Sequence, residues 1–351
     1  MKKIWVGLIV LAAVGLAVWG IFSDFERIKM ATLDKRSAEY NGWLHVDGAN
    51  ILNEHDESIQ LTGISTHGIQ WYDKLYTRES IAQLKEEFGI NVFRIAMYVN
   101  PDDDGYVANQ ALADRVAELV DICVDLDIYV VVDWHILNDN NPQIYQQNAL
   151  DFFAKMAERY AETPNVIYEI CNEPNGKDIT WKEHIRPYAE AVVARIREIA
   201  PKALVIVGTP DWSKDLTSVA VEPLSDSNVA YALHFYAGSH NKTLRDKIDG
   251  FREKNLAVFV SECGATDSTG DGQLYDEAFG RWVNYMNEKQ ISWIYWSYSN
   301  KDEASAMLKP DVVPILAAEA DDAEPKTLDD YLSESGKLAK KYLNQEKASQ
   351  D

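Results

Sequence analysis

The sequence has few cysteines and few histidines, and this scarcity excludes several kinds of site. Its 351 residues include three cysteines and seven histidines. Cys123, Cys171 and Cys263 are odd in number and widely spaced, which is the pattern of neither a disulfide framework nor a zinc site. We therefore expect free, buried thiols. No two histidines have the spacing of metal ligands, so the sequence predicts no catalytic metal and no cofactor.

Runs of basic residues are also missing. The chain has 34 Lys and Arg against 56 Asp and Glu, which gives a formal net charge of −22. A nucleic-acid partner requires a basic stripe, so this class of protein is excluded. The acidity suits a neutral substrate better than a polyanion, which the protein would repel. The sequence also shows no internal repeat of fixed period and no Ser/Thr/Pro-rich linker to a second domain.

One long apolar run lies near the N-terminus, at residues 4–22, after Met1-Lys2-Lys3. Its length of roughly 19 residues approaches the ~20 that a helix needs to cross a bilayer. A cleaved signal peptide usually has a shorter apolar region and a small-residue cleavage site, and this run offers no good one. The pattern favours a signal anchor over residues 1–22, followed by a polar tether over residues 23–38. The two lysines favour a location outside the cytoplasm for the rest of the chain. It would be anchored to the membrane, or secreted if the segment is cleaved.

The chain from residue 39 to 346 alternates short apolar runs with amphipathic stretches, such as 109–127, 179–200, 273–290 and 328–345. Nearly continuous apolarity is typical of strands that are buried on both faces. The expected strands are 58–65, 91–98, 129–135, 166–173, 204–210, 229–236, 257–264 and 291–298. Eight such βα units predict an α/β fold of the (β/α)8 TIM-barrel type.

Three further segments complete the expected organisation. Residues 43–57 are typical of a short hairpin, which would close the barrel floor. Residues 310–327 are acidic and rich in Pro and Ala, and we expect a surface loop there. Residues 347–351 are a tail.

Polar and aromatic residues gather at one end of each expected strand. In a TIM barrel the active site lies at the C-terminal ends of the strands. The residues expected there are His67, Arg94, Tyr98, Asp133, Trp134, His135, Asn172, Glu173, Trp212, His234, Tyr236, Glu262 and Trp296. A barrel selected for stability alone would have no reason to place them all at the same end.

Side chains two residues apart in a strand point to the same face. The sets expected to share a face are Glu169, Cys171 and Glu173; Val258, Val260 and Glu262; His234 and Tyr236; and Arg94 and Tyr98. We expect Glu169 and Asp133 to form a buried polar network rather than to react. His240 is expected to be an ordinary loop residue.

Two glutamates at the barrel mouth, Glu173 and Glu262, suggest glycoside hydrolysis. In the retaining mechanism two carboxyl groups about 5–5.5 Å apart act as nucleophile and as acid then base. One must hold a proton while the other stays ionised. We expect Arg94, His234 and Tyr236 to keep Glu262 ionised by hydrogen bonding.

Seven segments follow one another in the order of the expected strands: GISTHGIQWY (63–72), NVFRIAMYV (91–99), VVDWH (131–135), VIYEICNEPNG (166–176), ALHFYAG (232–238), FVSECG (259–264) and WIYWSYSNKDEASAML (293–308). In this order they resemble glycoside hydrolase family 5, in its bacterial endoglucanase branch, and the resemblance covers about residues 39–346. The Asn-Glu-Pro at 172–174 alone would be a weak motif, and the ordered set is what makes the resemblance specific.

The resemblance implies a retaining endo-β-1,4-glucanase that acts on a β-1,4-glucan as a monomer. Glu173 matches the acid/base and Glu262 the nucleophile. Asn172 matches the residue that bonds the sugar 2-hydroxyl. The matching positions that orient the nucleophile or contact the sugar are Arg94, Tyr236, His135 and His234. Those that match the substrate cleft are His67, Trp71, Tyr98, Trp212, Trp296, Lys301 and Glu303, with Trp296 as the platform beneath the sugar before the scissile bond.

Other functions remain open at this stage. A β-mannanase, lichenase or xyloglucanase would share the scaffold and both carboxylates, although HGIQWY and KDEASA favour β-1,4-glucan. A non-catalytic sugar-binding protein would have lost one carboxylate, and both are present. A phosphate-using barrel would need a Gly-rich anion loop after strands seven and eight, whereas the eighth strand continues into Tyr298-Ser299-Asn300-Lys301.

Overall fold

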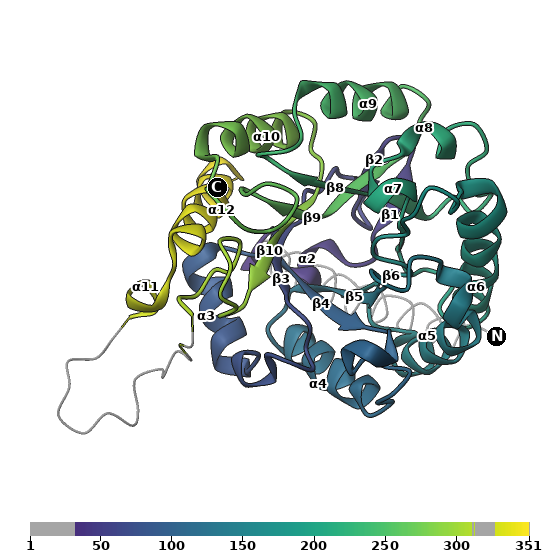
Figure 1. Ribbon diagram of the computed structural model, residues 1–351, viewed down its shortest axis with the longest axis horizontal. Coiled ribbons are helices and arrows are strands. Elements are labelled where there is room, and N and C mark those ends of the chain that lie inside the picture. The colour runs from purple at the N-terminus through teal and green to yellow at the C-terminus, as the bar shows by residue number, and fades with distance from the viewer. Residues whose placement is uncertain (1–31, 311, 313–326, 351) are drawn as a thin grey trace, which may run out of the picture.

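Eight parallel strands close into a barrel with helices around the outside (Figure 1). The computed structural model describes residues 32–310, 312 and 327–350. The barrel strands are β3 (Thr62–Thr66), β4 (Val92–Tyr98), β5 (Tyr129–His135), β6 (Val166–Glu169), β7 (Val205–Val207), β8 (Val229–Tyr236), β9 (Val258–Gly264) and β10 (Trp293–Tyr298). Their order around the barrel follows the chain, and β10 pairs with β3 to close it. The predicted closed barrel of eight parallel strands is confirmed.

Amphipathic helices alternate with the strands and cover them. The longer ones are α3 (Arg78–Phe88), α4 (Leu112–Asp125), α5 (Gln146–Tyr160), α6 (Arg186–Ile199), α9 (Lys242–Arg252), α10 (Asp276–Glu288) and α12 (Glu334–Gln350); the short ones include α2 (Ala38–Asn41), α7 (Pro210–Ser213), α8 (Leu216–Val219) and α11 (Leu328–Tyr331). Helix α3 shows how sequence sets the ends. Thr77 and Ser80 form a capping box at its start, and Gly89 ends it in the left-handed conformation, at φ 64°.

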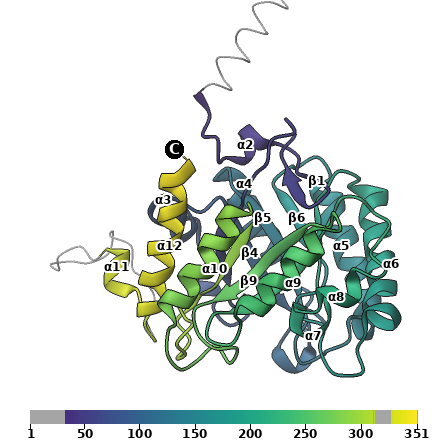
Figure 2. The same cartoon turned by 90° about the horizontal axis from the view of Figure 1, so that it is seen from above.

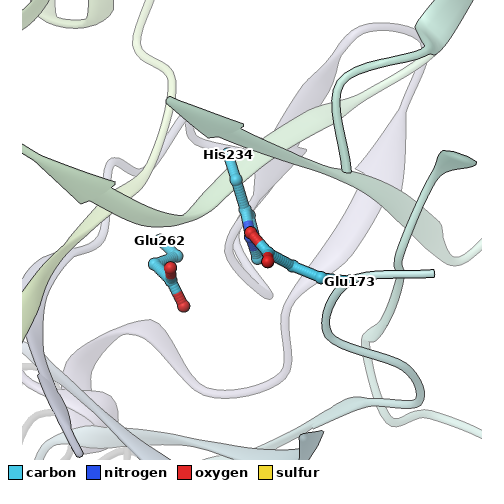
Figure 3. Close-up of side chains that lie close together, drawn as sticks. All are labelled: Glu173, His234 and Glu262. Carbon is cyan, nitrogen blue, oxygen red and sulfur yellow. The ribbon is translucent and has the colours of Figure 1, made fainter. Parts of the chain in front are cut away.

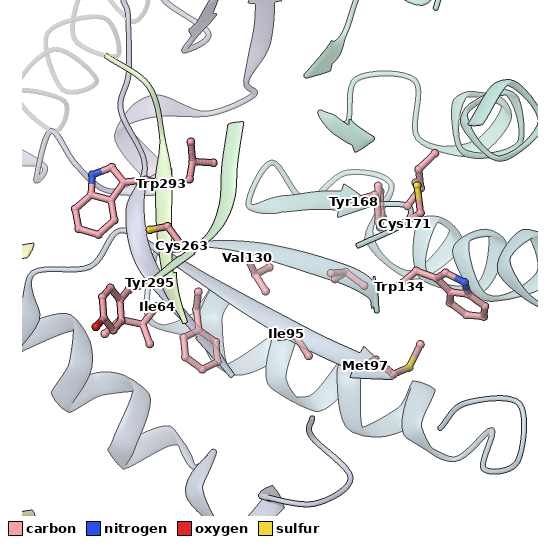
Figure 4. Close-up of a cluster of buried hydrophobic side chains, with 14 of the residues drawn as sticks. Ile64, Ile95, Met97, Val130, Trp134, Tyr168, Cys171, Cys263, Trp293 and Tyr295 are labelled. Atoms are coloured by element: carbon pink, nitrogen blue, oxygen red, sulfur yellow. The ribbon is translucent and has the colours of Figure 1, made fainter. Parts of the chain in front are cut away.

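The core has two layers, separated by the strands. Outward-facing side chains such as Phe93, Ile95 and Met97 pack beneath the helices (Figure 4). Inward-facing ones such as Val92 and Val131 fill the lower part of the barrel. Because both faces of each strand are buried, nearly every position along the strand is apolar.

The barrel floor is closed by an antiparallel hairpin of β1 (His45–Asp47) and β2 (Asn50–Leu52), as predicted. Leu44 and Ile51 join the inner cluster at the N-terminal ends of the strands. Ala38, in α2, belongs to the same cluster, and the Tyr129 hydroxyl donates a hydrogen bond to the Gly42 carbonyl oxygen at 2.7 Å. The N-terminal end of the described chain therefore packs on the floor, opposite the loops that follow the strands (Figure 2).

Strand β6 is shorter than expected, and this changes the direction of one side chain. The strand ends at Glu169. Cys171 lies in the outer cluster with Tyr168 instead of facing the barrel interior with Glu169. The predicted common face of Glu169, Cys171 and Glu173 is therefore wrong, because regular alternation stops where strand pairing stops.

Strand β9 contains an extra residue relative to both of its neighbours. Its pairing with β8 passes from Ala232↔Phe259 to His234↔Glu262, and its pairing with β10 shows the same shift. Such a β-bulge re-aims the side chains beyond it. Val258 and Val260 pack in the outer layer, whereas Ser261 and Glu262 contact residues of the barrel interior. The expected common face of Val258, Val260 and Glu262 is wrong for this reason.

Two sequence predictions fall outside the described residues: the apolar run at 4–22 and most of the loop at 310–327. Among the residues that are described, no helix combines the length and the apolarity that crossing a bilayer needs.

Candidate active site

A buried arginine, Arg94, occupies the centre of the barrel beneath its mouth. Its side chain is fully buried, and Nε lies 2.7 Å from Glu169 Oε2. Its terminal nitrogens lie 3.0 Å from Asp133 Oδ2 and 3.3 Å from Glu262 Oε2. Burial lowers the pKa of Arg94, but the three carboxylates raise it above its usual value. Asp133 and Glu169 form the buried polar network that their strand positions predicted.

Glu262 stands beside this cation at the end of β9. Its Oε1 accepts a hydrogen bond from the Tyr236 hydroxyl at 2.8 Å, and its Oε2 accepts one from Arg94 at 3.3 Å. Burial raises the pKa of Glu262, and the charge of Glu173 adds to this effect. His234, Arg94 and Tyr236 oppose it without reversing the direction. The carboxyl group is thus fixed in position, and its charge depends on its neighbours.

Glu173 lies beyond the end of β6, where loop hydrogen bonds take over from strand pairing. The backbone N–H of Asn172 donates to the Trp134 carbonyl oxygen at 3.1 Å, and that of Glu173 to Ile136 at 3.3 Å. From below, the Ser213 hydroxyl donates to the Asn172 carbonyl oxygen at 2.6 Å. Segment 172–175 is therefore held against the end of β5, with the Glu173 side chain at the mouth.

The two glutamates lie on either side of His234 (Figure 3). One oxygen of Glu173, one of Glu262 and a ring nitrogen of His234 all lie within 4.8 Å of one another. Retaining glycosidases have carboxyl groups about 5–5.5 Å apart, and inverting ones about 6.5–9.5 Å apart. Oxygens of the two carboxyl groups therefore approach more closely than the inverting range, which favours the retaining geometry.

His234 contacts Glu173 rather than Glu262, which corrects the expected contact. Its Nδ1 lies 2.8 Å from Glu173 Oε1, and its Nε2 lies 3.0 Å from Ser261 Oγ. Burial lowers the pKa of His234, but the nearby carboxylates of Glu169, Glu173 and Glu262 raise it to about 10. The imidazole therefore acts on Glu262 through its charge alone.

These three groups could also be read as metal ligands, and the fit is poor. A metal needs neutral imidazole and ligand bonds of about 2.0–2.2 Å. Both ring nitrogens of His234 are already engaged by protein atoms, and its raised pKa favours the protonated ring. The trio is better suited to moving protons.

His135 and Asn172 form a second polar pair beside the glutamates. His135 Nδ1 donates to Asp133 Oδ2 at 2.6 Å, and burial followed by the charge of Arg94 lowers the pKa of His135. The neutral ring accepts from the Asn172 amide nitrogen at 3.3 Å, while the amide oxygen accepts from Arg94 at 2.7 Å. The orientation of the Asn172 amide is thereby set by its neighbours.

A cleft of about 490 Å³ opens above these groups. The predicted residues that line it are His67, Tyr98, His135, Asn172, Glu173, Trp212, His234, Tyr236, Glu262, Trp296, Lys301 and Glu303. Arg94 lies beneath it. Trp71 lies beside it, with its ring centroid 4.6 Å from that of Tyr98. Trp134, which was also expected at the mouth, points outward and packs against Phe152 instead.

Aromatic rings stand at the base of the cleft and beside its ends. Trp296 is stacked on His135 at 5.4 Å, with an interplanar angle of 13°. Trp71 and Trp212 each leave 42% of their surface exposed, and they follow β3 and β7 on opposite sides of the barrel. Exposed aromatic faces of this kind offer stacking surfaces for flat, weakly polar ligands.

Several lining residues escaped the sequence analysis. They are Leu137, Lys214, His240, Ser268, Thr269 and Gly270, all in loops that follow strands. The expectation for His240 was wrong: it lines the cleft, and its Nδ1 accepts from the Tyr236 backbone N–H at 2.8 Å. Only the position of these residues, after a strand end, pointed to the site.

Comparison with known families agrees with this geometry. A family model described as cellulase, glycosyl hydrolase family 5, matches residues 52–302. The chain belongs to glycosyl hydrolase family 5.

Relatives in family 5 resemble the chain in sequence and in structure. Endoglucanase N of Pectobacterium atrosepticum is 44% identical over 283 residues, which are 81% of this chain and 63% of the relative. Endoglucanase A of Evansella cellulosilytica is 45% identical over 258 residues, which are 74% and 52% of the two chains. The chain thus spans between about half and two thirds of the length of these family 5 relatives.

A solved structure extends the likeness to the fold of the whole domain. It is a variant of the catalytic domain of Thermobifida fusca endoglucanase E5 in complex with cellotetraose. The similarity has a TM-score of 0.80 at 34% identity, and it covers 88% of this family 5 chain and 99% of the other.

Proposed function

We propose that the protein is a retaining endo-β-1,4-glucanase that hydrolyses internal bonds of cellulose-type glucans. The observation that carries the proposal is the pair Glu173 and Glu262, whose carboxyl oxygens lie within 4.8 Å at the base of a cleft. Two relatives with the name endoglucanase and a related domain solved with cellotetraose support the choice of β-1,4-glucan.

In the first step Glu262 attacks the anomeric carbon of the sugar. Arg94 and the Tyr236 hydroxyl hold the two oxygens of its carboxylate, so the nucleophile is oriented before substrate arrives. Glu173 gives its proton to the glycosidic oxygen as that bond breaks. The products of the step are a glycosyl ester on Glu262 and a free chain end.

In the second step water replaces the leaving chain. Glu173, now a carboxylate, removes a proton from the water, whose oxygen attacks the anomeric carbon and releases Glu262. Two displacements at one carbon restore its original configuration, so the product is the β-anomer.

The remaining residues of the cleft bind the glucan. Asn172 presents its amide nitrogen beside His135, where a sugar 2-hydroxyl can accept from the amide and donate to the imidazole. Trp296 forms the platform for the sugar before the scissile bond. Trp71 and Trp212 stack sugars towards the two ends, and the ion pair of Lys301 and Glu303, at 2.5 Å, binds hydroxyl groups.

A neighbouring β-glycan, such as mannan, mixed-linkage glucan or xyloglucan, is the alternative substrate. An activity panel on carboxymethyl-cellulose, lichenan, mannan and xylan separates these cases. We expect the highest kcat/KM on carboxymethyl-cellulose. A clear preference for mannan would overturn the substrate assignment while leaving the glycosidase assignment intact.

We also propose that the catalytic domain is a monomer outside the cytoplasm. Residues 1–22 would anchor it to the membrane. The described chain begins on the barrel floor, opposite the loops that follow the strands (Figure 2). An anchor at that end would place the membrane on the side of the domain away from those loops, which line the cleft. Cell fractionation tests this part. Activity should sediment with membranes, and a soluble product that begins near residue 24 would show cleavage instead.

A further inference from the structure

A chain of buried hydrogen bonds continues behind His234, away from the cleft. Its Nε2 lies 3.0 Å from Ser261 Oγ, and the Ser261 hydroxyl lies 2.6 Å from Glu169 Oε1. The other oxygen of Glu169 is held by Arg94 Nε at 2.7 Å. Ser261 and Glu169 are both 0% exposed. On the cleft side, Nδ1 of the same ring faces Glu173 Oε1 at 2.8 Å.

The direction of these hydrogen bonds follows from the charge of Glu169. Burial raises the pKa of Glu169, but Arg94 and His234 lower it to about 2. An ionised carboxylate can only accept hydrogen bonds. The Ser261 hydroxyl therefore donates to Glu169, and its oxygen accepts from His234. The Nε2 atom of His234 must then carry a hydrogen.

We propose that Ser261 and Glu169 are positioning residues for the acid/base step: they hold one proton on Nε2 of His234, and so reserve Nδ1 for proton exchange with Glu173. This inference rests on the proposed function, because only a glycosidase mechanism requires Glu173 to donate and regain a proton. The bulge in β9 makes the arrangement possible: Ser261 faces the interior by regular alternation with Phe259, and the extra residue turns Glu262 to the same side.

One proton moves in this exchange, across the 2.8 Å between Nδ1 and Oε1. When the proton is on Nδ1, His234 is an imidazolium and Glu173 is a carboxylate. When the proton is on Oε1, Glu173 is the protonated acid and the His234 ring is neutral. No other bond forms or breaks. After Glu173 has protonated the leaving oxygen, the Nδ1 lone pair faces a carboxylate with no proton between them. This repulsion strengthens Glu173 as the base that takes the proton from water.

The surroundings of His234 allow both of its protonation states. The titratable groups that face it are Glu173 beyond β6, Glu169 on β6, Glu262 on β9, and Asp133 and His135 on β5. The carboxylates favour the imidazolium, and burial favours the neutral ring. Because these effects oppose each other, a small change at Glu173 decides where the shared proton lies.

Loss of the Ser261 hydroxyl would remove the hydrogen-bond acceptor that keeps a proton on Nε2 of His234. Glu169 Oε1 lies 3.7 Å from Nε2, which is too far for a direct hydrogen bond. A neutral ring would then place its single proton on Nδ1, donate it to Glu173, and keep that carboxyl group ionised. General acid catalysis contributes about 10²–10⁴-fold, and part of this factor would be lost.

The first test compares leaving groups in Ser261→Ala, with Ser261→Thr as the conservative variant. Phenyl β-cellobioside needs an acid to leave, and 2,4-dinitrophenyl β-cellobioside does not. We expect kcat/KM of Ser261→Ala to fall about tenfold or more on the phenyl substrate and to change little on the other. Threonine should restore the wild-type ratio. Ser335→Ala is the matched control, since Ser335 is also buried but bonds Tyr295 and Ser305.

The second test reads the tautomer directly and needs no turnover. In protein labelled with ¹⁵N-histidine, the His234 signals are assigned by their loss in His234→Asn. In the wild type Nε2 should keep its proton as pH rises past the pKa of His234, about 10, whereas Nδ1 should lose its proton there. The neutral ring of Ser261→Ala should instead carry its proton on Nδ1. An unprotonated Nε2 in the wild type, or equal loss on both substrates in a folded Ser261→Ala, would overturn the inference. A wild type that cleaves no glucan but shows the expected tautomer would refute the proposed function instead.

Discussion

Replacing Arg94 by Gln removes a positive charge that contacts Asp133, Glu169 and Glu262 at once. The guanidinium is fully buried and reaches the three carboxylates at 3.0, 2.7 and 3.3 Å. Removing one partner of a buried ion pair costs about 3–5 kcal/mol, because the remaining charge stays buried and uncompensated. We expect a loss of this size in the free energy of unfolding at pH 7, measured by urea denaturation.

The pH dependence of this loss gives a sharper test. In the wild type the pKa of Glu169 is lowered to about 2, so its contribution to stability is present above the unfolded value near 4.5 and is lost as pH falls towards 2. Arg94→Gln removes the main cause of that shift. The stability gap between the two proteins should therefore be largest above pH 4.5 and should narrow below it.

Arg78→Gln is the matched control for the buried arginine. Arg78 pairs with Asp125 at 2.9 Å, but the two side chains are 49% and 68% exposed. An exposed pair of this kind contributes about 0–1 kcal/mol. A loss in Arg94→Gln no greater than that in Arg78→Gln, or a gap that does not change with pH, would refute the electrostatic account of the network.

Three further predictions concern the cleft and its neighbours. Glu262→Gln should abolish cleavage of carboxymethyl-cellulose and leave oligosaccharide binding by calorimetry intact; full activity would exclude Glu262 as nucleophile. The raised pKa of His234, about 10, stabilises the fold below pH 6.5, and this contribution is lost as pH rises to about 10. His234→Gln should flatten the urea-derived stability curve over that range, and an unchanged slope would contradict the assignment. Trp212→Ala should lower kcat/KM on cello-oligosaccharides about five- to thirtyfold, because a stacking contact of about 1–2 kcal/mol is lost. The control Val221→Ala, at a side chain that is 79% exposed, should leave kcat/KM unchanged. Equal effects of the two substitutions would argue against stacking.

The strands could be predicted from sequence because they are buried on both faces. Strand β5 has the predicted bounds, 129–135, and β8 has the predicted bounds, 229–236. Their first residues are buried in the core, and their last residues, His135 and Tyr236, line the cleft. A run of apolar residues that ends in polar ones therefore locates both the strand and its functional end. The same reasoning placed most of the cleft.

Local irregularity set the limit of that prediction. The bulge in β9 leaves no mark in a run of apolar residues, although it decides that Glu262 faces inward beside Ser261. The predicted hydrogen-bond partner of His234, Glu262, was wrong for a related reason. The actual partner, Glu173, reaches His234 from a loop and not from a paired strand. Loop residues such as His240 had no periodicity to reveal them. Residues 1–22 remain a prediction of sequence alone.

In the proposed mechanism Glu262 forms a covalent bond to the sugar. A 2-deoxy-2-fluoro-β-cellobioside with a dinitrophenolate leaving group should form this ester and break it slowly. Intact-mass spectrometry should then show one added fluorocellobiosyl unit, and peptide mapping should place it on Glu262. A label on another residue, or no label together with an α-anomeric product from cello-oligosaccharides by NMR, would contradict the account.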